Sequence, residues 1–299
     1  MERYVVIAAV ALLPVAALIP VRAQAPRSPA TANATAVAGE EQYWCAMHPD
    51  QRSDRPGRCP ICGMALMRIP PARFVTYPVD LRATPTVNGV RLRLAVRDPA
   101  TQKVVRDFAI VHERPLHLFV VGNGLEFFAH DHPVQQADGV FMIDLALPRP
   151  GPYMAIAEFQ PERANAQMFQ QIFTTGGAFD PSATPAVDLA PKTIDGLRVS
   201  IDVSKVKSGE ASTLAFRVDN AASGAAVTDL EPYLGASAHL LIVASDLTEA
   251  IHGHPEEDRR PALTFTPIIP RPGRYKVWLQ VQRAGRVSTA AFVLEVAAT

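Results

Sequence analysis

The chain has 299 residues, of which 48 % are hydrophobic and 19 % are charged. This composition excludes a chain that is disordered throughout and allows two or three folded domains. The 29 basic and 29 acidic residues cancel, which removes any general argument for binding to nucleic acid or to an anionic membrane surface. The 27 prolines are scattered and favour β-structure with many turns over long helices.

The N-terminal segment has the pattern of a secretory signal. A short basic start precedes an apolar run over residues 5–19, which is too short to cross a bilayer comfortably, and a Val-Arg-Ala sequence ends at Ala23. We predict a signal peptide at residues 1–23 and a periplasmic or secreted protein; an uncleaved anchor is the alternative, and we expect contact with the membrane only through this segment. Residues 24–40 are rich in Ala, Pro, Ser and Thr, as in a flexible linker.

All three cysteines of the chain lie close together after this linker. Two residues separate Cys45 from His48, and two separate Cys59 from Cys62. Each pair can supply one arm of a tetrahedral metal site, and thiolates favour soft or borderline ions such as Cu(I) and Zn(II). A disulfide between Cys59 and Cys62, with Cys45 free, is the alternative reading of an odd cysteine count in an exported protein.

Methionines accompany these cysteines in a recognisable order. Residues 43–49 read YWCAMHP and residues 58–66 read RCPICGMAL. The segment 43–70 resembles the heavy-metal-binding domain of copper-transporting ATPases and of periplasmic adaptors of metal efflux pumps, although that domain usually has proline where Ala46 stands. The resemblance implies a metal-binding domain at 41–70, and an efflux pump or adaptor as partner. In some similar adaptors methionines bind the metal, which adds Met47 and Met64 to the candidate ligands.

The remainder of the chain contains one unit used twice. Residues 117–133 align with residues 239–255, and the same shift of 122 positions aligns the whole of 92–153 without a gap. Alternating apolar residues at 90–98 and 212–220, short apolar runs and Pro-Gly turns predict β-strands. We therefore predict a mainly β protein with two tandem immunoglobulin-like sandwiches at 74–177 and 187–299; cupredoxin-like barrels are the near alternative.

Six of the eight histidines occupy equivalent positions in the two units. They form two triads: His117, His130 and His132 in the first unit, and His239, His252 and His254 in the second. Asn123-Gly124 predicts a two-residue hairpin turn that places His117 opposite His130, with His132 on the same face. The second unit would repeat this geometry around Ser245-Asp246, so that three imidazoles converge in each unit.

Three further residues are weaker candidates for a role at the triads. Asp107 and Asp229, equivalent in the repeat, are candidates for holding a ligand histidine in place; surface aspartates in a turn are the equal alternative. His112, which aligns with Leu234, is a candidate fourth ligand of the first triad. A purely structural role for the histidines stays open, because duplication copies structural residues as faithfully as ligands.

These patterns favour an exported protein that captures, buffers or delivers copper or zinc. The first alternative is a protein-binding scaffold of two sandwiches with one structural metal knuckle. The second is a metal-dependent hydrolase or oxidase with a three-histidine site. No catalytic residues are assigned, because no nucleophile elbow, phosphate loop or repeated pair of carboxylates occurs in the sequence.

Overall fold

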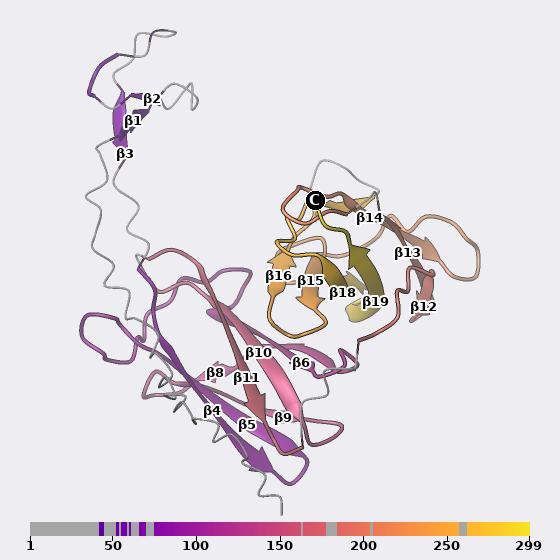
Figure 1. Ribbon diagram of the computed structural model, residues 1–299, viewed down its shortest axis with the longest axis horizontal. Coiled ribbons are helices and arrows are strands. Elements are labelled where there is room, and N and C mark those ends of the chain that lie inside the picture. Colours follow the sequence, from indigo (N-terminus) through magenta and orange to yellow (C-terminus); the bar gives the residue numbers. More distant parts are fainter. Residues whose placement is uncertain are drawn as a thin grey trace, which may run out of the picture. The chain divides into compact units, whose positions relative to one another are not determined.

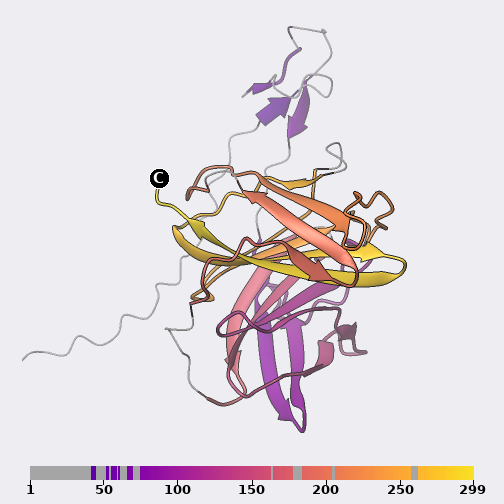
Figure 2. The ribbon, with the colours of Figure 1, turned by 90° about the vertical axis from the view of Figure 1, so that its right-hand side faces the viewer.

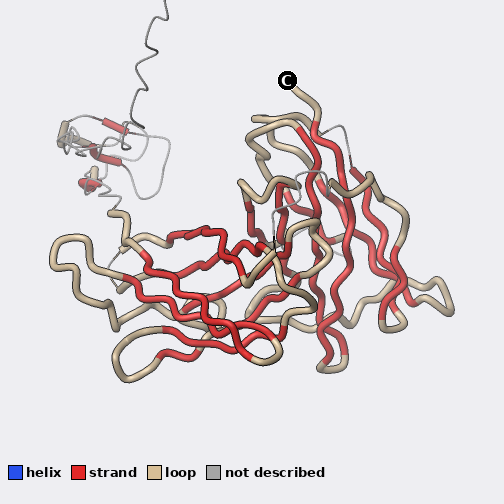
Figure 3. Tube along the Cα trace, turned by 60° about the horizontal axis from the view of Figure 1, so that its bottom comes forward, coloured by secondary structure: helices blue, strands red, loops and turns tan. Residues whose placement is uncertain are grey.

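The structure of the protein is a computed structural model. It describes residues 42–44, 52–53, 55–58, 60, 66–69, 75–162, 164–177, 184–203, 206–256 and 262–299. The chain divides into two compact units, residues 1–73 and residues 74–299. The described parts are strands joined by loops and turns (Figure 3). Among the described residues there is no helix long and apolar enough to span a bilayer.

The first unit contains a small antiparallel sheet. Its strands are β1 (Gln42–Trp44), β2 (Arg52–Ser53) and β3 (Met67–Ile69), in the order β2-β1-β3. Outside the sheet, the backbone N–H of Leu66 donates to the carbonyl of Gly57 at 2.9 Å. This hydrogen bond joins the two ends of the stretch 57–66, which contains Cys59 and Cys62 but not Cys45.

The second unit begins with a sandwich of two four-stranded antiparallel sheets. The outer sheet has the order β4 (Val79–Thr86), β5 (Gly89–Val96), β9 (Phe141–Ala146), β8 (Val134–Gln135). The inner sheet has the order β11 (Gln167–Thr174), β10 (Pro152–Phe159), β6 (Leu116–Gly122), β7 (Phe128–Asp131). The apolar residues between the sheets, among them Leu92, Leu118 and Phe141, form the core of this sandwich.

A second sandwich follows with the same plan (Figures 1 and 2). Its outer sheet has the order β12 (Lys192–Ile194), β13 (Leu197–Val203), β14 (Leu214–Asn220), β17 (Leu263–Phe265). Its inner sheet has the order β16 (Ala250–Gly253), β15 (His239–Ala244), β18 (Gly273–Arg283), β19 (Arg286–Val296). Leu240, Phe216 and Phe292 belong to its core.

The central strands of both inner sheets, β6 and β10 in the first and β15 and β18 in the second, are buried on two faces. Along β6, Leu118 and Val120 point into the core of their own sandwich, whereas Phe119 and Val121 join a third apolar cluster. We call this cluster the interface core, because it also contains residues of the second sandwich, such as Trp278. The rings of Trp278 and Phe128 stack with centroids 5.1 Å apart. Burial of both faces explains why the central strands are continuous apolar runs rather than alternating ones.

The predicted fold class is confirmed: the described chain is all-β, with four antiparallel sheets forming two tandem sandwiches after a small sheet. The equivalence of the repeats extends to the backbone. Leu125 and Leu247, 122 positions apart, both have positive φ, at 59° and 57°. His112 and Leu234 do so as well, at 48° and 49°.

Candidate metal centre

The hairpin that carries the first triad has a different register from the predicted one. His130 pairs with Phe119 rather than with His117, and in the second unit His252 pairs with Leu241. The chain makes a longer loop between Gly122 and Phe128 instead of a two-residue turn, because Leu125 turns inward and is fully buried in the interface core. The register therefore moves by two residues, which leaves the histidines on one face because side chains alternate with period two.

The first triad consists of three imidazoles that meet at their nitrogens. His117 Nδ1 lies 3.3 Å from His130 Nε2 and 3.2 Å from His132 Nε2. All three ligand atoms lie within 4.8 Å of one another. β6 supplies His117 and β7 supplies His130, and His132 follows directly after β7.

The second triad repeats this arrangement. His239 Nδ1 lies 3.1 Å from His252 Nε2 and 3.1 Å from His254 Nε2. Its ligand atoms also lie within 4.8 Å of one another. In a tetrahedral site with metal–nitrogen distances of about 2.0 Å, neighbouring ligand nitrogens are about 3.3 Å apart. Both triads therefore have the spacing that a tetrahedral ion needs.

In each imidazole, the outward nitrogen is the ring nitrogen that faces away from the other members of the triad. Its hydrogen-bond partner shows which of the two ring nitrogens carries the proton. His117 Nε2 lies 2.9 Å from the carbonyl oxygen of Val111, and His239 Nε2 lies 2.8 Å from that of Tyr233. A carbonyl oxygen only accepts, so each Nε2 carries the proton and each Nδ1 presents a lone pair. These backbone contacts orient the ligands as outer partners do in known metal sites.

Two further outward nitrogens bond across the interface between the sandwiches. His130 Nδ1 donates to Gln280 Oε1 at 2.7 Å, and His252 Nδ1 donates to Glu158 Oε2 at 2.5 Å. Within each triad, two lone pairs therefore face each other about 3 Å apart without a proton between them. Such an arrangement is unfavourable unless a cation lies between them, so the residues present fit a metal ion.

Burial keeps these imidazoles neutral. His117 and His239 expose only 3 % and 1 % of their surface. Loss of hydration is the largest cause that lowers the pKa in five of the six, with neighbouring histidines adding to it. The affected residues are His117, lowered, His130, lowered to about 2, His132, to about 4, and His239 and His254, each to about 3. Neutral imidazole is the form that binds metal.

Two of the weaker predictions are wrong in detail. His112 lies nearer the second triad than the first, with its ring centroid 4.0 Å from that of His254 and 6.2 Å from that of His117. Asp229 forms a bidentate ion pair with Arg283 instead of holding a ligand histidine. The position of His112 depends on a contact between the sandwiches, whereas Asp229 pairs with an arginine on β18 of its own sandwich; neither contact is visible in the local sequence pattern.

Glu158 and Gln280 are the site residues that sequence reasoning missed. They are also 122 positions apart, so the repeat makes them equivalent. Within its own sandwich, each lies directly across from the first histidine of a triad: Glu158 pairs with His117, and Gln280 pairs with His239. Alignment of the two units places a polar residue at the same position of an otherwise apolar strand in both repeats. This was the sequence signal that could have identified Glu158 and Gln280.

The predicted ligands of the cysteine segment, Cys45, Met47, His48, Cys59, Cys62 and Met64, lie outside the described residues. So does the predicted signal peptide. The geometry of a metal site in this segment is therefore left as a prediction.

A cavity of about 270 Å³ opens beside the first triad. His112, His117, Glu158 and Met168 contribute to its walls. It reaches both a ligand of the first triad and the carboxylate that bonds to the second. Of the histidines, only His112 and His117 line this cavity among the described residues.

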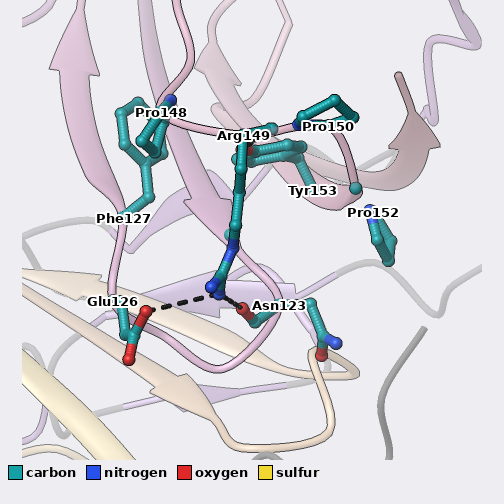
Figure 4. Close-up of a pocket in the computed structure, with 10 residues that line it drawn as sticks. Asn123, Glu126, Phe127, Pro148, Arg149, Pro150, Pro152 and Tyr153 are labelled. Atoms are coloured by element: carbon teal, nitrogen blue, oxygen red, sulfur yellow. Dashed lines mark hydrogen bonds and ion pairs between the residues drawn. The ribbon is translucent and has the colours of Figure 1, made fainter. Parts of the chain in front are cut away.

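A larger cavity, of about 540 Å³, lies at the far end of β6 (Figure 4). Arg149 crosses it to pair with Glu126 at 3.3 Å, and Tyr153 donates to the carbonyl of Arg149 at 2.6 Å. The second sandwich has the same tyrosine contact, Tyr275 to the carbonyl of Arg271. Since these contacts recur, we interpret this cavity as part of the repeated loop architecture.

Comparison with protein families identifies two segments. Residues 42–69 match the model of the heavy metal binding domain. Residues 192–298 match a domain of unknown function, DUF8832. A search of curated proteins returned no match.

Comparison with solved structures finds chains of low sequence identity and low TM-score. A two-domain fibronectin type-III segment of chicken tenascin is 12 % identical, with 74 % of this chain and 100 % of that chain covered and a TM-score of 0.23. The chicken interferon gamma receptor alpha chain is 10 % identical, with 75 % and 99 % covered and a TM-score of 0.24. A DUF3823 family protein from Bacteroides uniformis is 12 % identical, with 68 % and 96 % covered and a TM-score of 0.22.

Proposed function

On the premise that residues 42–69 are a heavy metal binding domain, we propose that this protein is an exported metal-binding protein that captures copper or zinc, buffers it and delivers it. One observation carries the proposal beyond that domain. In both triads, three imidazole nitrogens gather around a common centre: two unprotonated nitrogens lie 3.1–3.3 Å apart, and the Nε2 of the third histidine lies 3.1–3.2 Å from one of them. Three such nitrogens suit Zn(II), Cu(II) or Cu(I) and leave one position for exchange.

The two kinds of site have different chemistry. The cysteine and methionine donors of the heavy metal binding domain are soft and favour Cu(I) or Zn(II). The buried imidazoles of the triads are borderline donors held in a rigid frame. An ion captured at the exposed domain is retained by the triads, or is passed to an efflux pump or adaptor. The signal-like N-terminus supports a location outside the cytoplasm.

The proposal assigns no catalytic role. Glu158, the carboxylate that contacts a triad imidazole, already accepts a hydrogen bond from His252 and so orients a ligand. A hydrolytic site needs such a group free to act as a general base. Binding and transfer of the ion are therefore the functions that this geometry supports best.

Metal analysis of the full chain tests the proposal. After anaerobic purification and loading with Zn²⁺, the wild type should hold three ions, one for the heavy metal binding domain and one for each triad. His117→Ala combined with His239→Ala should leave one ion, and replacing Cys45, Cys59 and Cys62 with serine should leave two. A wild-type protein that holds only one ion, lost with the cysteines, would contradict the assignment of the triads.

A further inference from the structure

The two triads differ in the group that holds their second histidine. In the first triad the acceptor for the His130 ring is the neutral amide of Gln280. In the second triad the acceptor for the His252 ring is the carboxylate of Glu158. The two triads are alike in spacing and backbone contacts. They differ in this exchange of amide for carboxylate, and in the ring of His112, which lies 4.0 Å from that of His254 beside the second triad.

The carboxylate of Glu158 has little compensation for its charge. Its side chain is only 26 % exposed, and that of His252 is 2 % exposed. Among the ion pairs of the described residues, Glu158 pairs with His252 and with no lysine or arginine. A poorly hydrated negative charge requires a nearby positive one. A divalent ion bound to the other nitrogen of His252 supplies that charge through the imidazole.

Gln280 has no such requirement. Its amide oxygen accepts from His130, and its amide nitrogen donates to Thr289 Oγ1 at 3.3 Å. Both ends of the amide are therefore satisfied without any charge. An ion at the first triad gains a correctly oriented ligand but no neutralising carboxylate.

Each of these acceptors belongs to the opposite sandwich. Glu158 lies on β10 of the first sandwich and holds a ligand of the second triad, while Gln280 lies on β18 of the second sandwich and holds a ligand of the first. The contacts are thus exchanged across the interface core. Each triad therefore takes all three histidines from one sandwich and the acceptor of its second histidine from the other.

Resting on the proposed function, we propose that the two triads are unequal sites: His239, His252 and His254 form the tight site for a divalent cation, set by Glu158, and His117, His130 and His132 form the weaker, exchangeable site. A carboxylate that accepts from a ligand imidazole makes that ligand more basic and offsets the charge of the ion. Outer partners of this kind typically change metal affinity by about 10- to 100-fold. The protein therefore holds one ion firmly and keeps a second for transfer.

The test exchanges the two acceptors in the full chain. The three cysteines are replaced by serine to remove the competing domain, and Zn²⁺ is titrated against a chromophoric chelator. His117→Ala isolates the second triad and His239→Ala isolates the first. In these two backgrounds we expect dissociation constants that differ by about 10-fold or more, with the second triad tighter.

Glu158→Gln should weaken the second triad by about 10-fold or more and bring it close to the first. The first triad already uses glutamine at the equivalent place, so the substitution keeps a hydrogen-bond acceptor of the same shape. Gln280→Glu should strengthen the first triad. Glu295→Gln, the same chemical change on β19 at the end of the inner sheet away from both triads, should alter neither affinity. Thermal unfolding of the metal-free variants checks that the fold is retained.

The outcomes separate this inference from the proposed function. Two triads that bind Zn²⁺ with equal affinity, or a Glu158→Gln variant with unchanged affinity at the second triad, would overturn the inequality while leaving metal binding intact. Absence of Zn²⁺ binding by both triads in the cysteine-free chain would overturn the proposed role of the triads itself.

Discussion

At the level of single residues, the informative feature is which nitrogen of each imidazole is occupied. The outer nitrogens of four histidines, His117, His130, His239 and His252, all donate to oxygen acceptors. Their inner nitrogens are consequently left as lone pairs directed at the other members of the triad. In the His117–His130 and His239–His252 pairs the outer acceptors take the protons, so no proton lies between the two facing nitrogens.

The lowered pKa values predict how the metal-free protein responds to acid. In the unfolded chain a histidine has a pKa of about 6.5. In the fold the pKa of His130 is about 2, that of His132 about 4, and those of His239 and His254 about 3. Below pH 6.5 the unfolded state therefore binds more protons, so the free energy of unfolding rises with pH between about 4 and 6.5 and is level above it.

Each histidine that takes up a proton only on unfolding contributes a slope of up to about 1.4 kcal/mol per pH unit, less where solvent reaches the ring. Urea unfolding of the chelator-treated protein at pH 5, 6, 7 and 8 measures this slope. His130→Phe, which removes one such group, should reduce it. A free energy of unfolding that does not change between pH 5 and pH 7 would contradict the buried, neutral state of the imidazoles.

At the level of elements, the β-hairpins position the histidines through their loops as well as their strands. Leu125 is fully buried and Leu247 is 2 % exposed, and both adopt left-handed backbone conformations to reach the interface core. This burial sets the register in which Phe119, rather than His117, lies opposite His130. The hydrophobic core thus determines which ring nitrogens meet.

Leu125→Ala is expected to destabilise the protein by about 2–5 kcal/mol, because it removes a buried side chain and leaves a cavity. It should also weaken Zn²⁺ binding at the first triad more than at the second, since it loosens the loop of only one hairpin. Leu247→Ala should show the opposite preference. Val87→Ala, at a position that is 99 % exposed, should change stability by less than about 0.5 kcal/mol. Equal loss of affinity at both triads in either leucine variant would contradict the role assigned to the loops.

At the level of the whole molecule, the triads depend on the contact between the sandwiches. The interface core joins apolar residues of both inner sheets, and two hydrogen bonds to ligand histidines cross from one sandwich to the other. Metal binding and docking of the sandwiches are consequently coupled. An ion that binds only the assembled state stabilises that state in proportion to its concentration over its dissociation constant.

Trp278→Ala tests this coupling, because Trp278 packs in the interface core and stacks on Phe128. We expect it to weaken Zn²⁺ binding at both triads and to cost about 3–5 kcal/mol of stability. Leu294→Ala, in the core of the second sandwich, should cost about 2–5 kcal/mol without this effect on affinity. Unchanged affinities in Trp278→Ala, measured by chelator competition, would show that docking and metal binding are independent.

Much of this organisation could be predicted from the sequence. The repeat at an offset of 122 residues identified the six triad histidines, and strand periodicity placed each triad on one face. The hairpin register and the position of His112 could not be predicted, because they depend on Leu125 and on the opposite sandwich. Glu158 and Gln280 were missed for the same reason: periodicity describes one strand, whereas their partners lie across an interface.

Anomalous X-ray scattering at the zinc edge from crystals of the Zn²⁺-loaded full chain tests the central claim most directly. The account predicts one peak at each triad, about 2.0–2.1 Å from three ring nitrogens: His117 Nδ1, His130 Nε2 and His132 Nε2 in the first, and His239 Nδ1, His252 Nε2 and His254 Nε2 in the second. A loaded protein with no anomalous peak at either triad would contradict it.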